Sequence, residues 1–273
     1  MKVNKKSIFG TTEFTLGIII IALFVIASIF TKSFCSFYNI TNLFKQGAIV
    51  GVLAIAQTAV IITGGIDISG GAIAGMSCML MALLQTRAGL PLGIYLIIGV
   101  AVAVGCGFVN AVIIYDLKVP PMIATLGTQT VFRGIVKLLC SGNPVTFTDE
   151  NVLRLGTDMV FGVIPILALF WIIIAIVVFL WLRYTISGRN MFVIGSGVEV
   201  AKLSGIKVRR MFYLVYSMAG LLYGIAGLML AGRVGMAQPG TGEGYDMNAI
   251  AAAVIGGASL AGGRGAVTGT LLG

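Results

Sequence analysis

Apolar stretches of similar length recur along the whole chain. Six of them contain no Asp, Glu, Lys or Arg, namely residues 14–30, 47–63, 68–84, 90–115, 163–182 and 212–232. Two further stretches, 119–140 and 249–273, are long enough to span a bilayer but contain basic residues. An α-helix crosses the hydrocarbon layer with about 20 predominantly apolar residues. The pattern therefore predicts an all-α fold, a polytopic transmembrane helical bundle with about 8 spans in one domain over residues 1–273.

The composition supports this class of protein. Hydrophobic residues make up 58% of the 273 residues, charged residues make up only 10%, and the mean hydropathy is +1.06. A soluble domain carries about 25% charged residues. The charges in this chain are too few to cover a water-facing surface, so lipid must cover most of it.

The basic residues are concentrated on one side of the expected membrane. The net charge is +9, and six basic residues fall within residues 183–211 against the single acid Glu199: Arg183, Arg189, Lys202, Lys207, Arg209 and Arg210. Three more precede the first apolar stretch: Lys2, Lys5 and Lys6. Because basic loops stay on the cytoplasmic side, both clusters predict a multi-pass membrane protein with a cytoplasmic N-terminus. Lys32 and Lys45, in an expected outer loop, weakly oppose this orientation. The partner of these charges is expected to be membrane lipid, with no nucleic acid.

The chain offers no recognisable catalytic or metal-binding set. It contains no histidine, and its cysteines form no C-x-x-C pair: Cys35, Cys78, Cys106 and Cys140. Metal binding and thiol–histidine catalysis are thereby nearly excluded. No small-x-small cleavage site follows the first apolar stretch, so we expect an uncleaved span rather than a signal peptide. We expect a protein that is not an enzyme and holds no metal or cofactor.

Residues 63–71 interrupt the apolar pattern with glycines and one acid, Asp67. A continuous helix over residues 47–84 would be roughly 57 Å long, near twice the hydrocarbon thickness. The chain must therefore turn at or inside the membrane edge, which predicts a broken or re-entrant element near residues 64–71. Irregular backbone at this depth is tolerated only where it is buried or lines a cavity. Asp67 and Ser69 are therefore candidates for a pathway or hinge, or alternatively for an N-cap of the following helix.

A polar stripe runs along the expected helix over residues 119–140. Thr125, Thr128 and Gln129 share one face, and Arg133 and Lys137 continue on nearly the same face. Such a stripe could line a path for a sugar-sized solute. The alternative, hydrogen bonding between helices, is about as plausible.

A glycine-rich segment, residues 238–248, precedes a helix of small residues. It contains no G-x-x-x-x-G-K-[ST] motif and no βαβ context, so the chain does not hydrolyse ATP by itself. Asn248 or Asp246 could cap the following helix, and Asn248 is a further pathway candidate. Glycines also stand four residues apart elsewhere, as in Gly220 and Gly224, a spacing that predicts close helix packing.

The loop over residues 183–211 contains a short amphipathic segment. Residues 198–204 are compatible with a helix, and Gly205 is a plausible stop. A short helix across a cytoplasmic loop is a surface that another protein can bind. The alternative is a helix that lies among lipid headgroups.

These segments, in this order, resemble the membrane permease subunits of ribose-type ABC importers, of the branched-chain/ribose permease superfamily. The matching pieces lie at residues 64–69, 119–121, 124–127, 132–134, 203–206, 237–239, 244–245, 249–251 and 256–265. They span nearly the whole chain. The last block is highly specific.

The resemblance implies a permease of the bacterial plasma (inner) membrane that forms the translocation pathway for a monosaccharide or related polyol. It implies a second permease subunit, as a homo- or heterodimer, cytoplasmic ATP-binding subunits that use the ATP, and an extracytoplasmic sugar-binding protein. By position, the segment that couples to the ATPase would include Glu199, Ala201, Leu203 and Gly205.

The chain departs from the family pattern in three places. It reads Asp-Ile-Ser-Gly-Gly at 67–71, where relatives usually read Asp-Leu-Ser-Val-Gly. It has Gly197, Val200 and a single Ala201 where relatives often carry Asn and paired Ala. Relatives also usually continue with two more spans, so the C-terminus is expected to be short relative to the family's usual 10 spans.

The alternative function is a secondary transporter or channel for a small polar solute. Such a protein typically needs titratable residues along its path, and the early helices offer only Asp67. The residues we expect in the pathway or its hinges are Asp67, Ser69, Thr125, Gln129 and Asn248. Which sugar is carried does not follow from the sequence.

Overall fold

The computed structural model describes residues 12–273, with side chains from residue 14 onward. The basic cluster Lys2, Lys5 and Lys6 lies outside the described residues. The helices are α1 (Thr12–Phe30), α2 (Phe37–Ile62), α3 (Gly70–Thr86), α4 (Leu92–Tyr115), α5 (Pro121–Cys140), α6 (Glu150–Thr157), α7 (Ile166–Tyr184), α8 (Ile186–Ser196), α9 (Val198–Leu203), α10 (Val208–Val234), α11 (Tyr245–Ile255) and α12 (Val267–Leu272). Two antiparallel strand pairs join β1 (Val145–Thr146) to β4 (Met236–Ala237) and β2 (Met159–Val160) to β3 (Ile164–Pro165).

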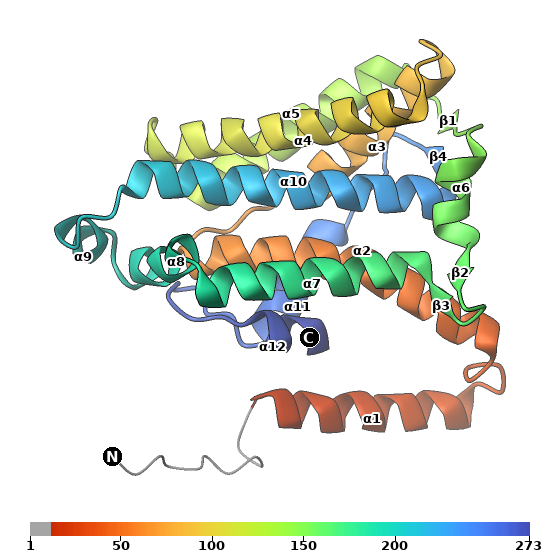
Figure 1. The fold of residues 1–273 in the computed structure, drawn as a ribbon, viewed down its shortest axis with the longest axis horizontal. Helices are drawn as coiled ribbons and strands as arrows, with labels where there is room; N and C mark the ends of the chain where they lie inside the picture. Colours follow the sequence, from red (N-terminus) through yellow and green to blue (C-terminus); the bar gives the residue numbers. More distant parts are fainter. Residues whose placement is uncertain (1–11) are drawn as a thin grey trace.

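The long helices run side by side along one axis in alternating directions (Figure 1). Within residues 12–273, α2, α4, α7 and α10 are long and apolar enough to cross a membrane, and α1, α3 and α11 are shorter apolar helices. This architecture confirms the predicted all-α membrane bundle. We call its two ends the α9 end, which carries α8 and α9, and the α6 end, which carries α6 and the strands.

Helix α10 lies in the middle of the bundle and packs against α2, α3, α4 and α6. Its contact with α4 brings two backbones together. A side chain at Gly107 would overlap the carbonyl oxygen of Tyr216, and one at Gly220 would overlap the carbonyl oxygen of Ala103. Gly220 and Gly224 both face α4, which confirms the close packing predicted from their spacing.

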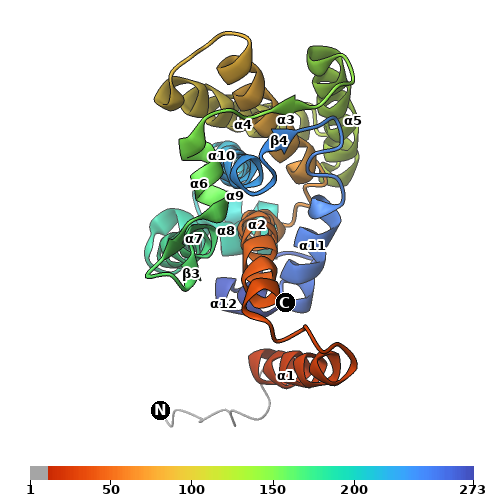
Figure 2. The ribbon, with the colours of Figure 1, turned by 90° about the vertical axis from the view of Figure 1, so that its right-hand side faces the viewer.

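Helix α2 is buried over its second half and forms the other side of the core. Helix α7 packs against it, with the indole ring of Trp171 lying over Gly51. The outer face of α7 exposes apolar side chains such as Ile173 and Val177, as expected for contact with lipid. Helix α1 stands apart from the other helices and contacts α12 (Figures 1 and 2).

The chain leaves the helical path between α2 and α3, as the sequence predicts. Helix α2 ends at Ile62 and α3 begins at Gly70. Gly64 has a φ of 83°, a left-handed conformation that glycine adopts without strain. Most of the intervening residues are buried, and α3 starts partway across the bundle (Figure 1). Non-helical backbone therefore lies inside the bundle.

The prediction of one continuous span over residues 249–273 is wrong. The structure has two short helices there, α11 and α12, because the connecting loop places Gly257, Gly262 and Gly263 at positive φ. The Gly263 amide donates to the Ile62 carbonyl oxygen at 2.9 Å. The two breaks in the helical pattern therefore contact each other, near the α9 end.

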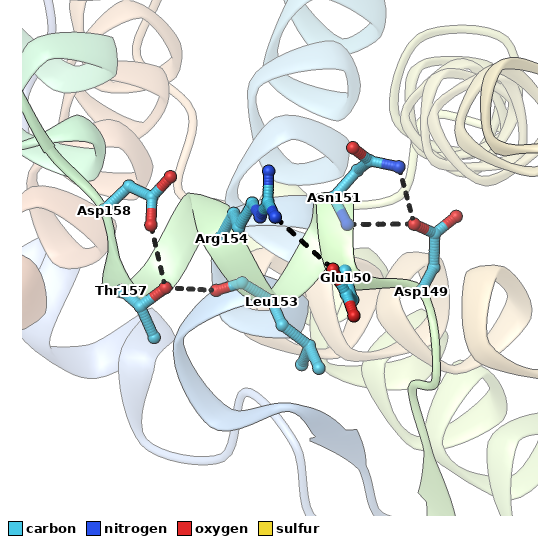
Figure 3. Close-up of polar contacts among 7 residues, drawn as sticks. All are labelled: Asp149, Glu150, Asn151, Leu153, Arg154, Thr157 and Asp158. Carbon is cyan, nitrogen blue, oxygen red and sulfur yellow. Dashed lines mark hydrogen bonds and ion pairs between the residues drawn. The ribbon is translucent and has the colours of Figure 1, made fainter.

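The α6 end contains the loop of residues 141–165, which includes α6. The Asp149 carboxylate precedes this helix, and its Oδ1 accepts hydrogen bonds from the backbone amide and the Nδ2 of Asn151, at 2.9 and 3.0 Å (Figure 3). Arg154 and Glu150 form an exposed ion pair at 3.4 Å (Figure 3). Pairing of β1 with β4 fastens the loop to the segment that follows α10.

Helix α9 is the short helix predicted within residues 183–211. After its last residue, Gly205 adopts a φ of 76°. The Gly205 amide donates to Lys202 O and the Ile206 amide donates to Ala201 O, both at 3.0 Å. This is a Schellman motif, so the helix and its glycine stop are both confirmed.

An ion pair joins α4 to α10 beside α9. Asp116, which follows α4, lies 3.0 Å from Arg209 and accepts a hydrogen bond from the Tyr213 hydroxyl. The Tyr213 hydrogen bond and the Arg209 guanidinium hold the pKa of Asp116 below its usual range. The Asp116 carboxylate, at the start of the loop from α4 to α5, therefore stays ionised and keeps its bond to Arg209.

We predict that Gly107→Ala destabilises the bundle, because its methyl group would overlap the Tyr216 carbonyl and force α4 from α10. Overpacking of this kind costs about 1–3 kcal/mol. The midpoint of thermal unfolding in detergent should fall. The control is Gly105→Ala on the same helix, where an added methyl group meets nothing within 4 Å. Equal midpoints for the two variants would contradict this packing.

Candidate functional site

Asp67 lies in the break between α2 and α3 and is almost completely buried. Its Oδ1 accepts hydrogen bonds from the Ser69 amide at 2.9 Å and from the Ser69 hydroxyl at 2.6 Å. The carboxylate thus closes a tight turn just before α3. Ser69 occupies the N-cap position, but its side chain makes no capping hydrogen bond. Ser69 is therefore the N-cap residue by position, but the predicted capping hydrogen bond is absent. The Asp67 carboxylate binds the amide of Ser69 instead of an amide within the first turn of α3.

Side chains from α4 and α5 hold the same break from outside. Asn110 on α4 donates from Nδ2 to the Ser69 hydroxyl at 2.8 Å. The Thr125 hydroxyl on α5 accepts from the Ile68 amide at 3.1 Å and lies 3.2 Å from the Ile66 carbonyl oxygen. Backbone groups in the break cannot form the hydrogen bonds of a helix, and the Thr125 hydroxyl provides a partner for two of them. Asp67, Ser69 and Thr125 are therefore brought together, as three of the predicted site residues.

Helices α2 and α10 complete the enclosure of Asp67. When the Gln57 side-chain amide is oriented so that its oxygen and its nitrogen both meet complementary groups, it accepts from the Asp67 backbone amide and donates to the Asp67 carbonyl oxygen, both at 3.1 Å. It also donates to the Tyr223 hydroxyl at 3.3 Å. Sequence reasoning missed Gln57, Asn110 and Tyr223. The available signal was the presence of single amide side chains within otherwise apolar stretches.

Within residues 12–273, three buried polar atoms near Asp67 have no hydrogen-bond partner. Asp67 Oδ2, Asn110 Oδ1 and the Tyr216 hydroxyl are buried and have no hydrogen-bond partner among these residues. Buried polar atoms usually have partners, and an acid at membrane depth is expensive and marks a functional element. Asp67 therefore remains the strongest candidate for a hinge or pathway residue among the five predicted.

Gln129 belongs to a second polar group, between α5 and α11. Its Nε2 donates to Asp246 Oδ2 at 2.7 Å. One turn further along α5, the Arg133 guanidinium donates to the Gly242 carbonyl oxygen at 3.4 Å. These residues line a cavity of about 560 Å³ on the side of the bundle. The hydrogen-bonding alternative is confirmed for this stripe, since Thr125 and Gln129 bond to other elements of the chain. Gln129 also faces the cavity, and its role in a solute path stays a prediction.

Asn248 is not brought to either group. It lies on α11 and is exposed. The expectation that Asn248 or Asp246 caps this helix is wrong, because α11 begins at Tyr245 with Gly244 as its N-cap. Gly244 has a φ of 80°, so the glycine run sets the start of the helix one residue before Asp246.

The four predicted coupling residues lie together on α9 and its glycine stop. Ala201 is buried against the bundle, whereas Leu203 is 90% exposed. Glu199 forms an exposed ion pair with Lys202 at 2.7 Å, and this pair raises the pKa of Lys202. The helix therefore presents one charged and apolar face away from the bundle.

Helix α8 connects α9 to the break near Asp67 through backbone contacts. A side chain at Gly195 on α8 would overlap the Ile62 carbonyl oxygen and the Gly263 amide. Gly262 also lies against Gly195 and Gly64. Because no side chain separates these segments, a displacement of α8 would press directly on the end of α2.

No cluster of three or more His, Cys, Asp or Glu side chains placed to hold a metal ion occurs in the described part of the chain. Cys35, Cys78, Cys106 and Cys140 are all free, and only Cys35 among them is exposed.

We predict that Thr125→Val destabilises the bundle while preserving side-chain shape. The Ile68 amide would lose its acceptor inside the protein, and an unsatisfied buried group costs about 1–3 kcal/mol. Thermal unfolding in detergent should shift to lower temperature. Thr130→Val is the matched control, because the exposed Thr130 hydroxyl bonds within its own helix, to Leu126 O. A loss as large in the control would show that Thr125 does not hold the break.

Comparison with known proteins gives this architecture its family. The ribose import permease protein RbsC of Bacillus subtilis is 41% identical over 260 residues, which cover 94% of this chain and 80% of the relative. The fructose import permease protein FrcC of Rhizobium meliloti is 33% identical, with 94% and 73% covered. The autoinducer 2 import system permease protein LsrC of Photorhabdus luminescens is 32% identical, with 98% and 80% covered. No solved structure is detectably similar.

These relatives confirm the resemblance to sugar-type ABC importer permeases. Residues 39–273 match the family described as branched-chain amino acid transport system, permease component. The match covers both helix breaks, the cavity between α5 and α11, and α9. The chain therefore belongs to this family of transport permeases.

Proposed function

We propose that this chain is the membrane-spanning permease subunit of an ABC importer for a monosaccharide or related polyol. Separate ATPase subunits would supply the energy. The names of the relatives support an imported solute of this class, since they are permeases for ribose, fructose and autoinducer 2. The structural observation that carries the proposal is α9, a short helix with a Schellman stop that projects from one end of a bundle of apolar helices (Figure 1).

The exposed face of α9 suits a groove on a partner. Val200 is 56% exposed and Leu203 is 90% exposed, and these residues stand three apart on one helical face. An amphipathic helix that lays apolar residues into a groove is a recurrent mode of recognition. Ala201 anchors the opposite face in the bundle. A cytoplasmic ATPase subunit that binds this helix could therefore displace the bundle without unfolding the helix.

A continuous set of contacts leads from α9 to Asp67. Helix α9 follows α8 directly, Gly195 on α8 lies against the end of α2, and the break begins there. Coupling between two sites needs an element with two arrangements that both sites influence. The non-helical segment at 63–69, held by hydrogen bonds from side chains on three helices, is our candidate for that element.

The orientation and the remaining partners follow from the same proposal. The α9 end carries Arg183, Arg189 and Lys207, whereas the α6 end carries the acids Asp149, Glu150 and Asp158 together with the basic residues Lys32 and Arg154. The bias of basic residues supports a cytoplasmic α9 end and N-terminus in the bacterial plasma membrane. The α6 end would then meet an extracytoplasmic sugar-binding protein. A second permease subunit would complete the importer.

We predict that Leu203→Ser abolishes co-purification of the partner ATPase subunit and stops ATP-dependent uptake. The permease itself should keep its thermal stability, because Leu203 makes little contact with the bundle. Phe161→Ser is the control: Phe161 is 94% exposed but lies at the α6 end, so ATPase binding should persist. Undiminished ATPase binding by the Leu203→Ser variant would rule out α9 as the docking helix.

We predict that Cys35 reacts with a membrane-impermeant maleimide on intact cells, because it is exposed in the turn between α1 and α2, at the α6 end. In a Cys35→Ser background, a Ser204→Cys variant should react only in inverted vesicles, since Ser204 lies beside α9. The reverse labelling pattern would overturn the proposed orientation. The buried Cys78, Cys106 and Cys140 should remain unlabelled in both preparations.

A further inference from the structure

The cavity between α5 and the start of α11 differs in chemistry from the other hollows of the bundle. Six of its lining side chains are polar or charged: Gln129, Thr130, Arg133, Lys137, Glu243 and Asp246. By contrast, the hollow between α7 and α12 is lined almost entirely by apolar side chains such as Trp171, Ile172 and Leu271. The apolar hollows suit lipid, whereas this one does not.

The depth of the cavity makes its polarity informative. With a rise of 1.5 Å per residue, Gln129 and Lys137 lie about 12 and 24 Å along α5 from its first residue, so the cavity occupies the half of the helix nearer the α6 end. Figure 2 shows α5 and α11 on the same side of the bundle, with the segment between β4 and α11 lying between them. Charged side chains are costly at such depths unless they face protein or a water-filled space.

The walls of the cavity are held rigidly. Gln129 bonds to Asp246 across the two helices, and Arg133 bonds to the Gly242 carbonyl oxygen. The backbone at 241–242 is itself pressed against α3, since side chains at Gly71 and Gly75 would overlap the carbonyl oxygens of Gly242 and Thr241. The cavity is therefore fixed by the fold before any solute arrives.

Several polar groups at the cavity remain available. Arg133, Lys137 and Glu243 form no ion pair with any residue in the range 12–273. Lys137 and Glu243 are exposed, and Arg133 uses one of its five N–H groups on Gly242. The lining thus combines strong donors with a carboxylate acceptor, and its two cations balance its two acids.

We propose that this cavity binds a neutral, polyhydroxylated solute. The proposal rests on the proposed function and names the side chains that would hold the solute in this chain. Each hydroxyl group of such a solute both donates and accepts, so adjacent hydroxyls can bridge Arg133 or Lys137 and Glu243. An anionic solute would meet Glu243 and Asp246, and a branched aliphatic side chain would find only Met247 as an apolar partner.

The test is uptake by the complete importer, reconstituted in proteoliposomes with its ATPase and binding protein. Labelled D-ribose and D-fructose serve as neutral probes, and ribose 5-phosphate and L-leucine serve as the anionic and aliphatic probes. Arg133→Gln and Glu243→Gln should each lower uptake of the neutral probe about tenfold below saturation, since a hydrogen bond to a charged group has roughly this effect on binding. The loss should appear mainly in KM, with ATPase binding unchanged.

The matched control is Arg183→Gln, which removes an exposed guanidinium from the last turn of α7, away from the cavity, from α6 and from α9. Uptake by this variant should stay within about twofold of the parent, because an exposed charge that bonds to no solute carries little energetic weight. Glu243 is exposed, so Glu243→Gln should fold even if Arg133→Gln does not accumulate. Uptake by the Glu243→Gln variant then decides whether the cavity binds the solute.

The outcomes separate this inference from the proposed function. If the parent importer takes up neither neutral probe, the proposed function fails. If it takes up D-ribose or D-fructose and the cavity variants match the control, the cavity is not the binding site and the proposed function stands. Preferred uptake of L-leucine or ribose 5-phosphate by the parent would overturn the neutral, polyhydroxylated class.

Discussion

Backbone polar groups inside a membrane must find partners within the protein, and the rest of this structure depends on how residues 63–69 meet that demand. The segment is not helical, yet it is mostly buried. Gln57, Asn110 and Thr125, from three different helices, bind it through its backbone or through Ser69. The segment is thus held by side chains whose positions depend on how α2, α4 and α5 are packed. A change in that packing would change the segment, which is the property that a hinge requires.

Close glycine contacts supply the rigidity around this adjustable segment. Gly107 and Gly220 bring α4 and α10 together, and Gly195 brings α8 against the end of α2. A packed side chain can change rotamer and absorb a small movement, whereas two backbones in contact cannot. Displacements of α9 and α8 would therefore reach the break at residue 63 without being dissipated. In this arrangement, a cytoplasmic ATPase would act on the pathway through a short and stiff connection.

The polar residues of α5 serve two sides of the same helix. Thr125 faces the break, and one turn later Gln129 faces α11 and the lateral cavity. A shift of α5 would therefore alter the support of the Asp67 turn and the shape of the cavity together. The proposed solute site and the proposed hinge are linked by one helix, so that movement at the hinge is expected to change how tightly a solute is held.

Much of the architecture was readable from the sequence alone, because apolar stretches, glycine breaks and helix stops are local signals. The break at 63–71, the short helix at 198–203 and its stop at Gly205 are of this kind. The tertiary structure decided what no local pattern contains: that Gln57 and Asn110 belong with Asp67, that Asn248 faces away, and that 249–273 forms two helices. Hydrogen bonds between distant helices depend on rotation and depth in the bundle, and these are set only when all the helices pack together.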